Sequence, residues 1–312
     1  MSVLGLLLAA GRGVRLAPLT DSRPKASLPL LDIPLGAWGL AELTGVSDTI
    51  VVNASSNAEA LEESLRPYGG PDAQFSVEWP EPWGSGGTVA ALKDRVHGVL
   101  VTLNADHLTD LRLADLLETH ARLQTPATIA VARVLEQADF KVENERATKL
   151  LDRRDDVVTD GYQYLGAGVF DRSVLDLIPA ERPMDLTRGL FAPLVRSGDL
   201  GVHIHRGYNL DVGTPGRYLR ASVDLLYGRG PRAPVQIPGD LFATGGGRAY
   251  VGPGAHVQDE LLGPDAIVLA GAEVPGNSFV SRAIVMPGER VGAETTLSGD
   301  IWVDGHVVPA SP

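Results

Sequence analysis

Apolar positions in the first two thirds of the chain follow two alternating patterns. Continuous apolar runs, which predict buried strands, lie at 3–9, 48–54, 97–106 and 127–134. Apolar residues at helical spacing, which predict helices, lie at 35–46, 57–68 and 111–123. Asn57 is the expected N-cap of the second of these helices. The alternation predicts an α/β fold, with a Rossmann-like mixed, mostly parallel sheet and helices on both of its faces.

The apolar pattern changes after residue 228. Segment 229–248 is rich in proline and glycine and predicts a linker between a domain at 1–228 and a second domain at 249–312. In the second domain, similar segments begin 17, 17 and 18 residues apart, at Val251, Val268, Val285 and Val303, and apolar residues recur every six positions within them. A period of six is typical of a parallel β-helix, and a valine-rich β-sandwich is the alternative. Because so short a solenoid leaves an end open, we expect a homo-oligomer formed through this domain.

Composition narrows the classes of partner. The chain of 312 residues carries 27 basic against 39 acidic residues, for a net charge of −12, and aromatic residues make up only 5% of it. No basic run is longer than a pair, so nucleic acid is not an expected partner. The absence of cysteine excludes disulfides and thiolate metal sites. The apolar stretch 3–10 is too short to cross a bilayer and lacks a basic flank, so we expect a cytoplasmic protein with no membrane partner.

The loop after the first strand carries the clearest chemistry. Gly11 and Gly13 allow the backbone to approach a ligand, while Arg15 and Lys25 supply a planar fork and a point charge for phosphate oxygens. Ligands of α/β sheets bind at this carboxyl edge of the strands, so the loop predicts a cradle for a nucleoside triphosphate. It lacks the Gly-Lys-Ser/Thr ending of a Walker A motif, and Leu16 stands where a dinucleotide fingerprint needs its third glycine.

This loop resembles the nucleotide-binding loop of the sugar-nucleotide pyrophosphorylases. The matching positions are Gly11, Gly13, Arg15, Pro18, Leu19, Thr20, Pro24, Lys25, Leu28 and Pro29. Four later segments also resemble motifs of that family, namely 81–88, 103–110, 164–170 and 207–221. A left-handed β-helix of hexapeptide repeats is a further family feature, so the likeness extends over nearly the whole chain.

The resemblance implies a reaction in which a nucleoside triphosphate and a sugar 1-phosphate give a nucleoside-diphosphate sugar and pyrophosphate. It gives catalytic roles to Arg15 and Lys25 and places Mg²⁺ on Asp106 and Asp211. The implied nucleotide-binding residues are Ala9, Ala10, Gly11, Gly13, Arg15, Lys25, Glu81, Gly86, Gly87 and Thr88. The implied sugar-phosphate-binding residues are Asn104, Asp152, Arg153, Gly166 and Gly168.

Several alternatives stay open at this point. Asp152 and Arg153 stand where the family usually has a Glu-Lys pair and could take its place, but they also fit a solvated charged turn. His203 and His205, with His107, would suit zinc, although phosphate chemistry favours oxygen ligands. GTP with mannose 1-phosphate is the expected substrate pair. The alternatives are a dTTP- or UTP-dependent enzyme for glucose or amino-sugar 1-phosphates, or a non-catalytic regulatory subunit that binds nucleotide sugars.

Overall fold

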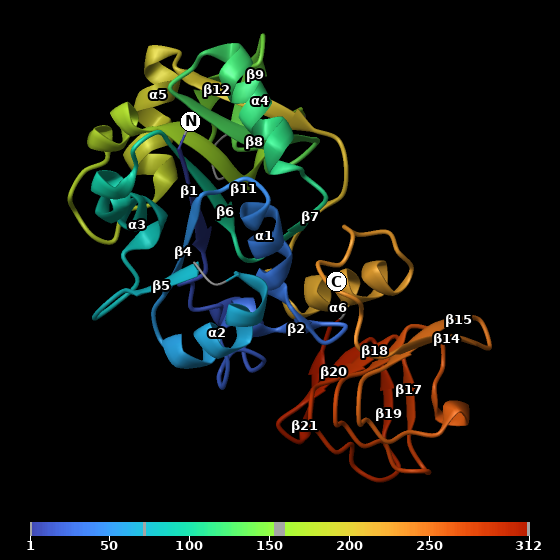
Figure 1. The fold of residues 1–312 in the computed structure, drawn as a ribbon. Coiled ribbons are helices and arrows are strands. Elements are labelled where there is room, and N and C mark those ends of the chain that lie inside the picture. Colours follow the sequence, from blue (N-terminus) through green and yellow to red (C-terminus); the bar gives the residue numbers. More distant parts are fainter. Residues whose placement is uncertain (1, 71–72, 153–159, 311–312) are drawn as a thin grey trace.

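The computed structural model describes residues 2–70, 73–152 and 160–310, and these residues form a nine-stranded central sheet (Figure 1). The strands lie in the order β5 (Ala73–Val77), β4 (Thr49–Ala54), β1 (Val3–Leu8), β6 (Val99–Asn104), β11 (Gly161–Asp171), β8 (Ala127–Val134), β12 (Leu200–His205), β10 (Arg146–Leu150) and β9 (Phe140–Glu143). β1 is parallel to β4 and β6, β4 to β5, and β8 to β12. The mixed α/β architecture is therefore confirmed.

Antiparallel pairs slightly outnumber parallel ones in the described part of this sheet, so the expectation of a mostly parallel sheet is wrong. β11 runs antiparallel to β6 and β8, and β10 runs antiparallel to β12 and β9. Between β8 and β11 the described residues contain no helix. A parallel pair needs a long crossover, so the short connections in this part of the chain produce antiparallel neighbours.

Helices cover both faces of the sheet. They are α1 (Leu35–Thr44), α2 (Ala58–Leu65), α3 (Gly84–Leu92), α4 (Leu113–Leu123), α5 (Ala192–Ser197) and α6 (Pro215–Leu226). α1 and α4 pack on one face, and α3 and α5 on the other (Figure 1). Leu6 and Leu7 of β1 point into these two different cores, which explains why the strand is apolar at consecutive positions.

Asn57 holds the N-cap position of α2, as expected, but its side chain does not cap the helix. Its φ of 57° and ψ of 36° place it in the left-handed region, and its side chain accepts no hydrogen bond from the helix. A capping residue has extended backbone, which aims its side-chain oxygen at the free N–H groups of the first turn. The first turn of α2 therefore lacks this side-chain cap.

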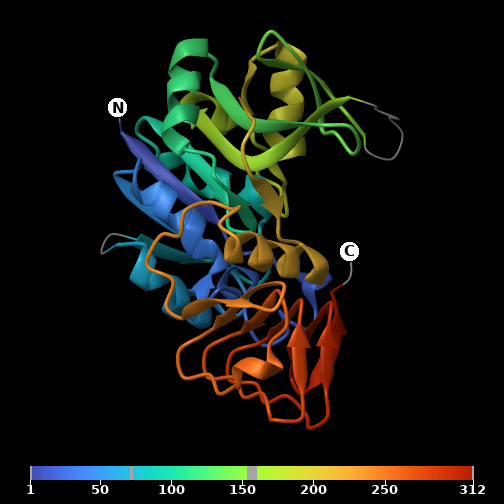
Figure 2. The same ribbon diagram turned by 90° about the vertical axis from the view of Figure 1, so that its right-hand side faces the viewer.

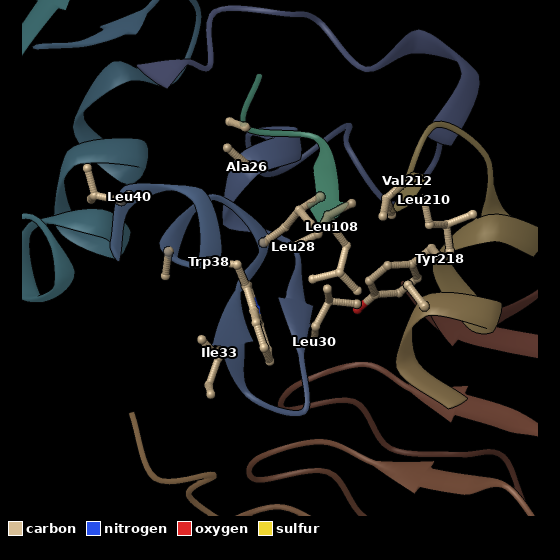
Figure 3. Close-up of a cluster of buried hydrophobic side chains, with 14 of the residues drawn as sticks. Ala26, Leu28, Leu30, Ile33, Trp38, Leu40, Leu108, Leu210, Val212 and Tyr218 are labelled. Carbon is tan, nitrogen blue, oxygen red and sulfur yellow. The ribbon is translucent and has the colours of Figure 1, made fainter. Parts of the chain in front are cut away.

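Two short pairs of strands connect distant parts of the chain. β7 (His107–Thr109) pairs antiparallel with β13 (Asn209–Asp211), which places Asp211 opposite His107. β2 (Pro29–Leu30) and β3 (Ile33–Pro34) form a hairpin with Asp32 at its tip. Figure 3 shows Leu28 and Leu30 packed with Leu108, Leu210, Val212 and Tyr218, in one cluster of buried side chains.

The C-terminal region contains β14 (Asp240–Thr244), β15 (Gly247–Val251), β16 (Ala266–Val268), β17 (Phe279–Ser281), β18 (Ala283–Val285), β19 (Thr296–Ser298), β20 (Asp300–Val303) and β21 (His306–Pro309). β15, β16, β18 and β20 stack in parallel, and Ile267, Ile284 and Ile301 face one another at steps of 17 residues. β17 and β19 form a second parallel pair, with Val280 opposite Leu297. In Figure 2, α6 lies between these strands and the central sheet.

Two features of this region differ from the sequence expectation. The segment expected as a linker contains β14 and the start of β15, which form a hairpin. The last repeat begins at Trp302, which pairs with Val285, rather than at Val303. Asp304 and Gly305, with φ of 50° and 74°, turn the chain back so that β21 runs antiparallel to β20. This two-residue turn sets the register of the final strand.

The C-terminal strands share a core with the central sheet. Tyr218 of α6 lies in one buried cluster with Ile284 and Met286. At the tip of the β2–β3 hairpin, Asp32 accepts hydrogen bonds from the Tyr250 hydroxyl at 2.8 Å and from the backbone N–H of Ala270 at 3.0 Å. The hairpin that follows the opening loop is therefore held by the C-terminal strands.

Candidate active site

The opening loop leaves the carboxyl end of β1 and is held there by β4. The side-chain oxygen of the buried Asn53 accepts the N–H groups of Ala9 and Ala10 at 2.6 and 3.2 Å. Gly13 has a φ of 66°, and a Cβ atom there would lie 3.0 Å from the methyl group of Thr20. Thr20 also donates its hydroxyl to the Gly13 carbonyl at 3.0 Å. The loop is thus fixed in shape by its own residues and by the neighbouring strand.

The two predicted cations of the loop converge on the two predicted metal ligands. The largely buried Lys25 donates its Nζ to Asp106 Oδ2 at 2.6 Å, and the same Nζ lies 4.0 Å from Asp211 Oδ1. Arg15 is mostly exposed, with its Nη2 4.0 Å from Asp211 Oδ2. Gly11 lies in the same loop, and an added Cβ there would meet no atom of the described residues within 4 Å. The space beside Gly11 is therefore open, and the charged ends of Arg15 and Lys25 belong to the loop that borders it.

The pairing of β7 with β13 explains why Asp106 and Asp211 are close together. The N–H of Val212 donates to the Asp106 carbonyl at 2.9 Å, which fixes the two chain segments. Asp106, His107 and Asp211 each place one ligand atom within 4.8 Å of the others. Asp106 Oδ1 is buried and has no hydrogen-bond partner among the described residues. A carboxylate oxygen without a partner beside a second carboxylate fits a divalent cation.

Charge around Asp106 keeps its carboxylate ionised. Burial opposes ionisation, but the positive charges of His107 and Lys25 and the hydrogen bond from Lys25 outweigh it and hold the pKa of Asp106 below its ordinary value. Asp211 accepts a hydrogen bond from Nη1 of Arg217 at 2.9 Å. Lys25 and Arg217 thus offset the negative charge of Asp106 and Asp211, which together form the acidic pair of this site.

A buried polar network centred on Glu78 lies beside the opening loop. Glu78 is only 2% exposed. Its carboxylate accepts hydrogen bonds from Asn53 Nδ2 at 2.8 Å, from the backbone N–H of Trp83 at 2.7 Å, and from the hydroxyl of Thr88. Thr88, a predicted nucleotide-binding residue, is therefore part of the network that orients Asn53.

Sequence reasoning chose Glu81 and overlooked Glu78 and Asn53. The Glu81 side chain is 73% exposed, and its Oε1 lies 3.4 Å from Nη2 of Arg12. Glu78 directly follows β5, and Asn53 lies near the end of β4, so both occupy the carboxyl edge of the sheet. Their position at that edge was the signal that could have identified them.

The glycines of the 81–88 segment meet the chain at Met184. Gly86 and Gly87 donate their N–H groups to the Met184 carbonyl at 2.8 and 3.0 Å. A Cβ atom on Gly84, whose φ is 76°, would lie 2.4 Å from the same oxygen. The structure therefore explains these glycines by close backbone packing, and it commits the N–H groups of Gly86 and Gly87 to that packing.

A cavity of about 210 Å³ joins the loop to the network. Its lining residues are Leu8, Ala10, Gly11, Asn53, Glu78, Pro82, Gly84, Ser85, Asn104 and Asp106. A smaller adjoining hollow is lined in part by Ala9 and Lys25. Asn104, expected at the sugar phosphate, thus opens onto the same space as the nucleotide-binding loop.

A second cavity of about 220 Å³ borders Asp211. Its lining residues are His107, Asp139, Phe140, Gln163, Tyr164, Thr187 and Asp211. Sequence reasoning missed Asp139, Gln163 and Thr187, which come from three separate segments without a shared motif. Asp106 lines the first cavity and Asp211 lines the second, so each cavity borders one of the two aspartates.

The remaining residues expected at the sugar phosphate are placed as follows. Gly166 has a φ of 74°, and a Cβ atom there would lie 2.8 Å from the Asn104 side chain, whereas one on Gly168 would lie 2.4 Å from the Phe170 ring. Asp152 is exposed, and Arg153 lies outside the described residues. Gly166 therefore accommodates Asn104, and Gly168 accommodates a core aromatic ring.

The histidines considered for zinc lie in different surroundings. His203 Nδ1 lies 2.8 Å from the Thr119 hydroxyl, and His205 Nε2 lies 2.8 Å from Asp110 Oδ1. Of these three histidines, only His107 belongs to the cluster with Asp106 and Asp211.

The described residues contain no helix that is long and apolar enough to span a membrane.

A cationic loop at the carboxyl edge of an α/β sheet, facing an acidic pair, defines an enzyme that transfers phosphate-linked groups. Comparison with known proteins gives the same class. The profile of the nucleotidyl transferase family matches residues 4–227, and the chain belongs to this family. The expected membership in the sugar-nucleotide pyrophosphorylases is confirmed.

Curated relatives resemble the chain over most of its length. A mannose-1-phosphate guanylyltransferase of Mycobacterium tuberculosis is 28% identical over 98% of this chain and 81% of its own. A mannose-1-phosphate guanyltransferase of Yarrowia lipolytica is 28% identical over 92% of this chain and 87% of its own. Mannose-1-phosphate guanylyltransferase 1 of Arabidopsis thaliana is 27% identical over 95% and 84%. The similarity therefore includes the C-terminal strands.

Proposed function

We propose that the protein condenses GTP with mannose 1-phosphate to give GDP-mannose and pyrophosphate. The observation that carries the proposal is the near full-length similarity to proteins named for this reaction. The convergence of Lys25 on Asp106 and Asp211 supports it, because the reaction needs positive charge and a cation site at one point.

The chemistry requires positioning and charge compensation. An oxygen of the sugar phosphate attacks the α-phosphorus of the nucleotide, and the bond from that phosphorus to the bridging oxygen breaks as pyrophosphate leaves. A phosphate monoester has a second pKa of about 6. The attacking phosphate oxygen is therefore already an anion at neutral pH, and no general base is needed. Arg15 and Lys25 offset the charge that develops on the α-phosphate and on pyrophosphate.

We assign Mg²⁺ to Asp106 and Asp211. The partnerless Oδ1 of Asp106 and the nearby carboxylate of Asp211 are hard oxygen donors, which Mg²⁺ prefers, and His107 lies beside them. The bound cation would lower the repulsion between the two anionic substrates. The pKa of Asp106 is lowered rather than raised despite burial, so its carboxylate is ionised at neutral pH and can bind a cation.

The two cavities suggest where the substrates bind. We assign the nucleotide to the space beside Gly11, Asn53 and Glu78, and the sugar phosphate to the space lined by Asp139 and Gln163. Lys25, Asp106 and Asp211 lie at the borders of these spaces. The polar groups of the second cavity suit sugar hydroxyls.

The remaining proposals concern organisation. We propose a nucleotidyltransferase domain at 1–228 and a short left-handed β-helix at 249–312, joined by a linker at 229–248 that includes β14 and the start of β15. Parallel ladders at 17-residue steps on different sides of the C-terminal region support the β-helix. We also propose that the protein is cytoplasmic and forms a homo-oligomer through this region, which size-exclusion chromatography of the full chain against variants of its outer strand β21 would test.

The test of the reaction is pyrophosphate release with Mg²⁺. Each of GTP, ATP, UTP, CTP and dTTP is combined with mannose, glucose and N-acetylglucosamine 1-phosphates. Release with GTP and mannose 1-phosphate alone supports the proposal. Release with dTTP or UTP and another sugar would replace the substrate assignment, and binding of GDP-mannose without any turnover would favour the regulatory subunit.

A further inference from the structure

A larger cavity, of about 840 Å³, lies between α6 and the C-terminal strands, whose relative positions Figure 2 shows. Its walls include Arg217 and Arg220 of α6, Arg229 just after α6, and Arg282 and Ser298 of the C-terminal region. Asn53 and Glu78 of the nucleotide cavity, and Asp139 and Gln163 of the second cavity, are absent from its walls. The cavity is therefore distinct from both substrate spaces.

The charge of this cavity is opposite to that of the protein. Four arginines and two aspartates, Asp224 and Asp265, line it, whereas the whole chain has a net charge of −12. Asp224 is shared between two arginines, with Oδ2 3.6 Å from Arg220 Nε and Oδ1 3.3 Å from Arg229 Nε. Arg282 Nε lies 3.8 Å from Asp265 Oδ2. The acidic residues thus leave a local excess of positive charge.

We infer that this cavity binds a small phosphorylated metabolite at a site separate from the active site. Guanidinium groups offer paired N–H donors that match phosphate oxygens. The side chains of Arg220 and Arg282 are 70% and 72% exposed, so most of their surface is open to a ligand. Leu219 and Val223 add apolar wall for the carbon part of the ligand, and the volume suits a molecule of metabolite size.

Arg217 connects this cavity to the active site. It lines the cavity, and its Nη1 donates to Asp211 Oδ2 at 2.9 Å. A phosphate that binds Arg217 competes with Asp211 for the same guanidinium. Occupancy of the cavity therefore changes the charge around Asp211 and, by linkage, the affinity for a divalent cation there. Binding itself requires no turnover, so it is independent of the proposed substrates.

The test uses the full-length protein with phenyl phosphate and inorganic phosphate as probes, titrated by calorimetry and by equilibrium dialysis. We expect binding at least tenfold weaker in the double variant Arg220→Ala/Arg282→Ala. Arg290→Ala is the matched control, since this C-terminal arginine is 77% exposed, pairs with Glu273 and does not line the cavity. Lys25→Met tests whether the probes bind at the opening loop instead of in this cavity. Arg290→Ala is expected to bind the probes as the unaltered protein does, and Lys25→Met is expected to keep the binding that the double variant loses.

A second variant, Ser298→Asp, adds negative charge to the cavity wall while keeping all four arginines, and it is also expected to weaken binding at least tenfold. Loss of binding in Lys25→Met with retention in the double variant would place the anion at the nucleotide loop and overturn the inference. No binding to the unaltered protein up to about 10 mM would overturn it as well. In a Mn²⁺ titration followed by electron paramagnetic resonance, saturating phenyl phosphate should shift the affinity severalfold, and an unchanged affinity would refute the coupling through Arg217.

Discussion

Replacing Lys25 with methionine separates a catalytic role for this residue from a structural one. Methionine keeps most of the length of the side chain but removes its charge and its hydrogen bond to Asp106. Loss of one fixed donor that faces charge in a transition state lowers the rate by roughly 10²–10³-fold, which corresponds to about 3–4 kcal/mol. We expect a loss of that size in the turnover number.

The expected loss of stability is smaller. Removing one partner from a fully buried ion pair costs about 3–5 kcal/mol. The Asp106 side chain, however, is 32% exposed and has His107 nearby, so water and the imidazole can compensate part of the lost interaction. We therefore expect the free energy of unfolding to fall by about 1–2 kcal/mol.

The assay measures pyrophosphate release at saturating substrates and urea unfolding of the same preparations. Lys93→Met is the matched control, because Lys93 also pairs with an aspartate, Asp176, at 3.0 Å, but on the surface. The control should change stability by about 0–1 kcal/mol and leave the rate unaltered. A rate loss below tenfold in Lys25→Met, or equal losses in rate and stability, would show that Lys25 is structural.

Further predictions concern the acidic pair, the buried network and the C-terminal contact. Asp106→Asn should abolish both turnover and Mn²⁺ binding, measured by paramagnetic resonance, with an unchanged circular dichroism spectrum; full activity would refute the metal assignment. Because the pKa of Asp106 is held below its ordinary 3.8, its ionised form stabilises the fold at higher pH, and this contribution is lost as the pH falls through the lowered pKa. Urea unfolding should therefore show the unaltered protein losing more stability than Asp106→Asn between about pH 4 and 2, and parallel curves would contradict this sign. Asn53→Ala leaves two loop N–H groups without their acceptor and should cost about 2–5 kcal/mol in urea unfolding and raise the KM for GTP, so an unchanged KM would remove its role in positioning the loop. Tyr218→Phe removes the hydrogen bond to the Pro29 carbonyl and should cost about 1–3 kcal/mol, again by urea unfolding, whereas a neutral result would mean that water replaces the hydroxyl.

The sheet was predictable from the sequence because its strands are buried on both faces. The run at 127–134 coincides with β8, and consecutive leucines of β1 face different cores. Such runs carry a strong apolar signal. The direction of β9, β10 and β11 was not predictable from apolar content, because it depends on the lengths of the connections and on which strands become neighbours.

The candidate site was predictable only in part. Lys25 and Asp106 were identified through motifs, and the structure brings them into contact. β7 and β13 have three residues each, too few to show a period, so their pairing was not visible in the sequence. Asn53 and Glu78 belong to none of the recognised motifs. Only the fold shows that both are buried and hydrogen-bonded to each other.

The contact between Asp32 and the C-terminal strands has a consequence for genetics and engineering. The hairpin that begins four residues after Lys25 ends its turn against Ala270 and Tyr250, far along the chain. A substitution near those two residues lies in a C-terminal region without catalytic groups. We nevertheless expect it to reduce the affinity for substrate. Screens for altered enzymes should therefore include this distant region, and shortened chains that end near residue 228 make poor starting points.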